Sequence, residues 1–242
     1  MLSTRILLNA TTALTVAAGL VLAATGVAKA TPMSLTITVS DGLGTTSQTF
    51  TDSATPNMIA LATTTIEGVT ITGEFNQSFI GVHNILTSSS TSVLNSSGST
   101  ASISVVISGQ NFTGPASFLS LSGSGTWLET PGSMITQNWY DDPSNVLGAN
   151  PTNTPGNLVG TFTNTAVGDT SSFAFSPGTS PLAVPDTGLF SMTESRSYTL
   201  ANGGELTDVG QTEIKSNIPE PASMLLLGLG MIGLGVVRRR RA

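Results

Sequence analysis

The single histidine, His83, is the first residue to test for chemistry, because a serine nucleophile needs a neighbouring base to take its proton. His83 lies between Val82 and Asn84 in an apolar stretch, and no serine occupies a Gly-x-Ser-x-Gly pattern. The chain has no cysteine, which excludes disulfides and cysteine nucleophiles, and one histidine is too few for a histidine zinc site. A structural or surface role is therefore predicted for His83.

Paired carboxylates are the second kind of chemistry to consider, since a glycosidase needs only two of them at a fixed separation. The spacing of the glutamates selects no pair, and aromatic residues, at 5%, are sparse for a sugar cleft. We therefore predict that the protein is not an enzyme, with a secreted hydrolase as the weaker alternative. The glutamates considered are Glu67, Glu74, Glu129, Glu194, Glu205 and Glu213.

Aromatic and acidic residues gather in the segment from Trp127 to Asn145. One hypothesis is a surface loop that stacks a sugar on the tryptophans or binds calcium through carboxylate and amide oxygens, including Asn145. The favoured alternative is that the tryptophans fill the core and the Asp-Asp-Pro sequence ends a strand. Residues 143–157, which are rich in proline and asparagine, predict a long irregular loop beside it. The patch consists of Trp127, Trp139, Tyr140, Asp141 and Asp142.

Charge is scarce and unevenly placed along the chain. Only 9% of the 242 residues are charged, against roughly 25% in soluble domains. Residues 31–217 carry thirteen acidic against two basic residues, a formal charge of −11. Nucleic acid is excluded as a partner, because affinity for it depends mostly on Lys and Arg.

The elements that must position these residues are short strands. Leu35, Ile37 and Val39 alternate with polar residues, and the same period of two recurs at residues 69–72, 103–108, 119–121, 173–175, 189–192 and 198–200. Turn residues such as Asp41-Gly42 separate these segments. Asn202-Gly203-Gly204 predicts a hairpin between residues 196–200 and 205–214, and the Ser/Thr-rich segment 87–100 predicts a loop. We expect an all-β fold, a single jelly-roll-like β-sandwich spanning residues 31–217.

The N-terminal residues 1–30 have the order of a secretory signal peptide. Arg5 precedes a mostly apolar run, which closes with Ala28-Lys29-Ala30. Signal peptidase recognises two small residues separated by one other residue, so cleavage after Ala30 is expected.

The C-terminal residues 218–242 combine three unlike features in fixed order. Pro219-Glu220-Pro221 precedes an apolar run from Met224 to Val237, and four arginines follow, Arg238, Arg239, Arg240 and Arg241. The prolines exclude a regular helix, so Glu220 is expected in an extended, accessible segment. The apolar run is shorter than the ~20 residues that a membrane-spanning helix needs, and the arginines are expected to remain cytoplasmic as a positive stop.

This C-terminal segment resembles the PEP-CTERM sorting signal of Gram-negative bacteria. The resemblance implies that Pro219, Glu220 and Pro221 are recognised by an exosortase, a membrane protease inferred to cut near them. It also implies export to the cell envelope, a membrane-held intermediate, and then the cell surface or extracellular space, in bacteria that make exopolysaccharide. We expect a non-enzymatic structural or surface role without a resident cofactor. The rival interpretation is a carbohydrate- or calcium-binding adhesin module.

Overall fold

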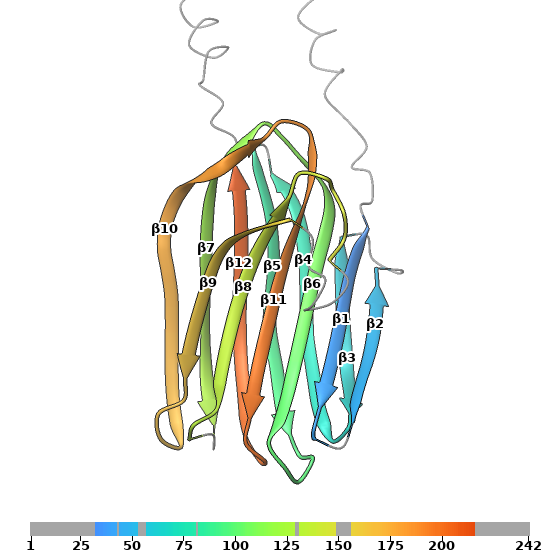
Figure 1. Cartoon of the computed structure of the whole chain (residues 1–242), viewed down its shortest axis with the longest axis vertical. Helices are drawn as coiled ribbons and strands as arrows, with labels where there is room; N and C mark the ends of the chain where they lie inside the picture. The colour runs from blue at the N-terminus through green and yellow to red at the C-terminus, as the bar shows by residue number, and fades with distance from the viewer. Residues whose placement is uncertain are drawn as a thin grey trace, which may run out of the picture. The chain divides into compact units, whose positions relative to one another are not determined.

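The computed structural model describes residues 32–42, 44–52, 57–80, 82–128, 131–148 and 156–215. Their regular structure consists entirely of β-strands (Figure 1). No helix in this described part of the chain is long and apolar enough to cross a membrane. The strands are β1 Met33–Ser40, β2 Thr45–Thr51, β3 Met58–Ile66, β4 Val69–Ile80, β5 His83–Asn95, β6 Ala101–Thr113, β7 Ala116–Leu128, β8 Met134–Asp142, β9 Asn157–Thr165, β10 Thr170–Asp186, β11 Leu189–Leu200 and β12 Glu205–Lys215.

The strands form two six-stranded sheets that pack face to face as a β-sandwich (Figure 1). Sheet A has the order β2-β1-β6-β11-β8-β9, and sheet B has the order β10-β7-β12-β5-β4-β3. Neighbouring strands pair antiparallel throughout. From β5 to β8 and from β9 to β12 the chain changes sheet at every connection, which is the crossing pattern of a jelly roll. The predicted all-β, jelly-roll-like sandwich is confirmed.

Alternating side chains build the core, as the period of two requires. Leu35, Ile37 and Val39 of β1 are fully buried, and Ile103 and Val105 of β6 lie beside them in sheet A. Sheet B contributes matching apolar side chains from β4, β5 and β12. Each such side chain stabilises the fold by roughly 1.5–3 kcal/mol through its removal from water.

Strand β10 contains three prolines, which it can accommodate because it lies at the edge of sheet B. Pro177, Pro181 and Pro185 lack the N–H that an inner strand would need to donate, and β10 has a neighbour, β7, on one side only. The register of β10 against β7 shifts between Phe175 and Gly178 and again between Pro181 and Asp186. The strand therefore bends along the margin of sheet B.

The predicted hairpin at residues 201–204 is wrong. β11 lies in sheet A and β12 lies in sheet B, so this turn crosses the sandwich instead of joining neighbouring strands. Asn95 holds the crossing in place, because its side-chain amide donates to the carbonyls of Leu200 (2.9 Å) and Ala201 (3.2 Å). The turn residues were identified correctly, but local turn chemistry does not decide which sheet receives the next strand.

The predicted loop at residues 87–100 is also largely wrong, because residues 87–95 belong to β5. Ser88, Thr91 and Asn95 occupy inward positions where an apolar residue is usual, and all three are buried. Polar residues are tolerated there because the interior beneath β5 is itself polar, as described below. Residues 143–148 lie outside the strands, as predicted for the start of the 143–157 loop.

Candidate functional site

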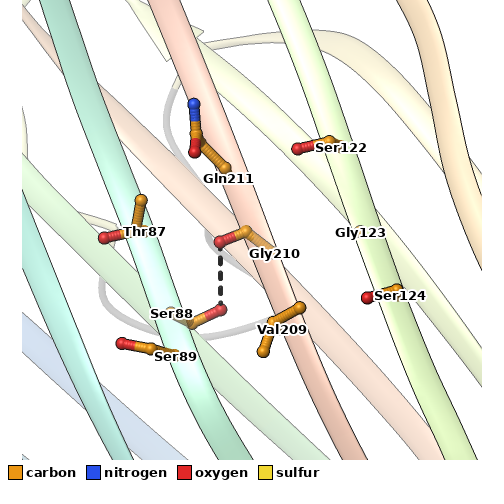
Figure 2. A pocket seen from close by; sticks show the side chains of 9 residues that line it. All are labelled: Thr87, Ser88, Ser89, Ser122, Gly123, Ser124, Val209, Gly210 and Gln211. Atoms are coloured by element: carbon orange, nitrogen blue, oxygen red, sulfur yellow. Dashed lines mark hydrogen bonds between the residues drawn. The ribbon is translucent and has the colours of Figure 1, made fainter.

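A shallow groove runs over the outer face of sheet B and encloses about 400 Å³ (Figure 2). Five of its nine lining residues carry a hydroxyl and one carries an amide, while none is charged or aromatic. We call it the serine groove; its residues are Thr87, Ser88 and Ser89 of β5, Ser122, Gly123 and Ser124 of β7, and Val209, Gly210 and Gln211 of β12.

The serine groove continues along β12. A second hollow of about 300 Å³ shares Ser124 and Val209 with it and extends to Thr126 and Thr207. The two hollows together form one elongated depression on sheet B. Asp208 is the one charged residue in the lining of either hollow, and its side chain is buried and points into the sandwich. Such a surface offers hydroxyl donors and acceptors to a neutral, extended ligand.

The floor of the serine groove is thin because two of its inward positions are glycines. A Cβ on Gly123 would stand 2.7 Å from Oε1 of Gln137, and a Cβ on Gly210 would collide with Arg196 and Glu194. Glycine inside a strand marks a close approach of this kind, but the sequence alone does not show that these two glycines lie opposite each other on β7 and β12.

A buried ion network fills the space beneath the groove. Arg196 of β11 reaches across from sheet A, donating from Nη2 to Glu194 Oε1 (2.7 Å) and from Nη1 to Asp208 Oδ2 (2.9 Å) of β12. Its guanidinium also donates to the hydroxyls of Ser88 and Thr91 on β5. All these side chains are at most 2% exposed, and Arg196 therefore ties the two sheets together.

Burial controls the protonation of this network. Burial raises the pKa of Glu194, with Arg196 opposing the shift. Burial and the charge of Glu194 raise the pKa of Asp208 to about 6, although Arg196 and a hydrogen bond from Gln137 lower it. Burial disfavours the charged form of Arg196, but the two carboxylates outweigh that effect and raise its pKa. Two carboxyls facing one guanidinium are expected to hold a proton at mildly acidic pH.

Both tryptophans of the predicted ligand patch lie in the core, with 0% exposure. Trp127 donates from its indole N–H to Asn164 Oδ1 (2.9 Å), and Trp139 stacks on Phe175 with ring centroids 5.5 Å apart. Neither indole is accessible to a sugar, which contradicts the surface-stacking hypothesis. Tyr140, on the opposite face of β8, is partly exposed.

The acidic residues of the same patch do not converge on one surface site either. Asp142 accepts hydrogen bonds from the backbone of Ser144 (3.0 Å) and Val146 (3.0 Å), so it ends β8 in a turn. The Asn145 amide instead donates to Asn111 Oδ1 (2.8 Å), and Asp141 points into the sandwich. Over the described residues, no three His, Cys, Asp or Glu side chains cluster as a metal site.

His83 lies on the outer face of sheet B, where its Nδ1 pairs with Glu213 of the adjacent strand β12. The remaining glutamates considered as catalytic pairs are dispersed. Glu67 accepts a hydrogen bond from Thr46, Glu74 from Asn76, and Glu205 from Ser92. Glu129 falls outside the described residues, so the structure gives no position for it.

The sorting and cleavage residues also lie outside the described residues. These are Ala28, Ala30, Pro219, Glu220, Pro221 and Arg238 to Arg241, together with the apolar run at residues 224–237.

Comparison with known families bears directly on the C-terminal segment. Residues 217–241 match the family model of the PEP-CTERM protein-sorting motif. This match confirms the sorting signal predicted from Pro219-Glu220-Pro221 and the arginine cluster. The chain is thus an exported protein, destined for the cell surface or the extracellular space.

Comparison with solved structures gives only distant similarity. TmCBM61 in complex with β-1,4-galactotriose is 8% identical, with a TM-score of 0.32 over 61% of this chain and 88% of that one. TmCBM27, a carbohydrate-binding module with specific mannan recognition, is 12% identical, with a TM-score of 0.29 over 66% and 90%. The adhesin domain of Lys-gingipain from Porphyromonas gingivalis W83 is 11% identical, with a TM-score of 0.27 over 57% and 85%. Likeness at this level carries no argument about function. None of the curated proteins compared with the sequence matches it.

Proposed function

We propose that this protein is a non-enzymatic component of the cell surface or extracellular matrix, delivered there by export and C-terminal sorting. The observation that carries the proposal is the PEP-CTERM motif at residues 217–241, attached to a β-sandwich with an uncharged, hydroxyl-rich groove on the outer face of sheet B. Serine and threonine make up 61 of the 187 residues from 31 to 217, which gives a surface that hydrates well with few charges.

The placement of the ionisable groups favours a structural role over catalysis. General acid–base chemistry needs a titratable side chain within reach of a bound substrate. None of the residues that line the serine groove is titratable, and the carboxyls of Glu194 and Asp208 are engaged by Arg196 inside the sandwich. His83 is paired with Glu213 on the surface of sheet B.

The test is to delete the protein from an exopolysaccharide-producing host and to analyse the matrix that remains. A structural component should leave the sugar composition and chain length of the purified polysaccharide unchanged, while the cohesion of flocs or biofilm falls. Cohesion is measured by dispersal under shear, and chain length by size-exclusion chromatography. A change in chain length or composition would show that the protein acts on the polysaccharide and would overturn the proposal.

A second candidate function, binding of a neutral polysaccharide, is favoured by the serine groove. Its hydroxyls lie on β5 and β7, on either side of β12, and Thr126 and Thr207 add two more in the second hollow, so an extended sugar chain meets hydrogen-bonding partners over its length. No aromatic ring lines the serine groove, and Phe173 in the second hollow is almost buried, so binding by a single groove should be weak. Many copies on one matrix chain would then act by avidity.

Co-sedimentation of the exported protein with the host's insoluble polysaccharide tests this candidate. The double substitution Ser122→Ala and Ser124→Ala removes two groove hydroxyls without changing the backbone, and the bound fraction should fall several-fold. The matched control is Ser102→Ala with Ser197→Ala, which removes two exposed hydroxyls from the outer face of sheet A. Equal retention of both double variants would exclude the groove as the binding surface.

A further inference from the structure

Two acidic side chains face the interior at one end of the sandwich. Asp141 continues the inward series of Gln137 and Trp139 on β8, in sheet A, and Asp186 ends β10, in sheet B. Each residue is only 2% exposed. Their carboxyls lie within hydrogen-bonding reach of each other across the gap between the sheets.

Three of the four oxygens of this pair lack a donor. Apart from a proton that the two carboxyls share, Oδ1 of Asp141 and both oxygens of Asp186 are buried and accept no hydrogen bond from the described part of the chain. The ion pairs among the described residues involve Arg196 and His83, and none includes either aspartate. Buried carboxylate oxygens in this condition are costly, and they require either a proton or a cation.

The pKa values of the two aspartates agree with a need for a proton or a cation between them. Burial, the charge of Asp186 and the hydrogen bond with it raise the pKa of Asp141 to about 8, and nearby Asp142 adds to the effect. Burial also raises the pKa of Asp186 to about 6, although its hydrogen bond with Asp141 lowers it. At neutral pH the pair thus keeps one proton and one negative charge, and among the described residues no ion pair gives it a basic partner.

A cavity leads from Asp141 to the margin of the sandwich. It encloses about 280 Å³ between the edge strands β9 and β10, and Asp141 forms part of its wall. Asn157 and Ser180 also line it, so further oxygen atoms are available near Asp141. The cavity provides an entry path for a small hydrated ion.

We propose that Asp141 and Asp186 form a calcium site that joins the two sheets at this end of the sandwich. Calcium takes six to eight oxygen ligands, and two carboxylates supply up to four of them, with carbonyls and water completing the shell. The uncoordinated oxygens come from opposite sheets, so one ion between them replaces mutual repulsion with a cross-link. Sites with few carboxylates in extracellular modules bind calcium with a dissociation constant of about 0.1–1 mM, which suits an exported protein.

The experiment is calorimetric titration and thermal unfolding of the full-length, chelator-treated protein with calcium chloride. Binding of one ion should raise Tm by about 5–10 °C at a calcium concentration about one hundred times the dissociation constant. The variants Asp141→Asn and Asp186→Asn keep the side-chain shape and remove the charge. Both should lose the calcium-dependent rise in Tm while remaining folded without calcium.

Asp169→Asn is the matched control, because Asp169 is an exposed acid in the turn between β9 and β10 and its replacement changes the net charge equally. It should keep the full calcium response. Absence of heat and of stabilisation in the wild-type protein would overturn the proposal, and so would a calcium response that Asp186→Asn leaves intact.

Discussion

The guanidinium of Arg196 lies between two buried carboxyls, Glu194 on its own strand and Asp208 on the facing sheet. Removing one member of a buried ion network leaves the others uncompensated, which usually costs about 3–5 kcal/mol. We therefore expect Arg196→Met to lower the free energy of unfolding by about that amount, measured by urea denaturation.

The control for this prediction replaces the whole network. A triple variant with Glu194→Gln, Arg196→Met and Asp208→Asn has no uncompensated charge and should recover a large part of the loss. If the triple variant is no more stable than Arg196→Met alone, lost packing of the long arginine side chain is the better explanation.

Asp208 also predicts a dependence of stability on pH. Its pKa is raised to about 6 in the folded protein from an ordinary value of 3.8, so between these two values the folded state holds more protons than the unfolded state. The stability that this proton contributes is fully present below about pH 4 and is lost as pH rises through about 6. Relative to Asp208→Asn, which does not titrate, the wild-type protein should lose on the order of 1–3 kcal/mol between pH 4 and pH 7.

Urea denaturation of both proteins at several pH values in this range measures the difference. The exposed Asp169→Asn again serves as control, because it should run parallel to the wild type. A constant difference between wild type and Asp208→Asn across the range would mean that Asp208 is already ionised at pH 4.

At the scale of the strands, the alternation of apolar and polar residues was sufficient to predict the fold class but not the partners of each strand. Residues 35–39 and 103–108 were identified from their period of two, and both are strands of sheet A. Residues 87–95 were missed because their inward positions include Ser88 and Thr91, which contact Arg196. A residue more than a hundred positions away thus decides the environment of β5, and no local pattern contains that information.

The serine groove could not be predicted for a related reason. Its lining comes from β5, β7 and β12, which are distant in sequence and adjacent only in sheet B. Each of its serines, threonines and glycines is individually unremarkable in a chain so rich in them. The tryptophans, in contrast, were placed correctly by the favoured core interpretation, because large apolar side chains on alternating strands are usually buried.

Replacing Gly210 tests whether the stability of the fold requires a glycine in the floor of the groove. The register of β12 against β5 shifts at this point, and a methyl group on Gly210 would collide with Arg196 and Glu194, which are fixed in their network. Gly210→Ala should therefore lower the free energy of unfolding by about 1–3 kcal/mol, as overpacking does elsewhere.

Gly188→Ala is the control, because a methyl group there would meet no atom within 4 Å. Its stability should stay within about 0.5 kcal/mol of the wild type in the same urea denaturation. Equal stability of the two variants would indicate that the buried network shifts at little cost.

At the scale of the whole chain, charge is divided among segments with different tasks. The body from residue 31 to 217 carries a formal charge of −11 from thirteen acidic and two basic residues, and half of the eight basic residues form the cluster Arg238 to Arg241. That cluster belongs to the segment matched by the PEP-CTERM motif. We expect the acidic body and the basic end to lie on opposite sides of a membrane during export, because Lys and Arg favour the cytoplasmic side.

Glu220 lies between two prolines at the centre of the sorting motif and is the residue to alter for a test of processing. We expect the wild-type protein recovered from its host to have an intact mass that lacks residues 1–30 and part of the tail. Glu220→Ala should lose residues 1–30 but keep the complete tail up to Ala242, because the protease no longer recognises its motif while signal peptidase is unaffected. Ser223→Ala, just beyond the motif, should be processed like the wild type. If the tail is uncut in the wild type, or is cut equally in Glu220→Ala, the segment acts as a plain membrane anchor and the exosortase has no part in releasing the sandwich.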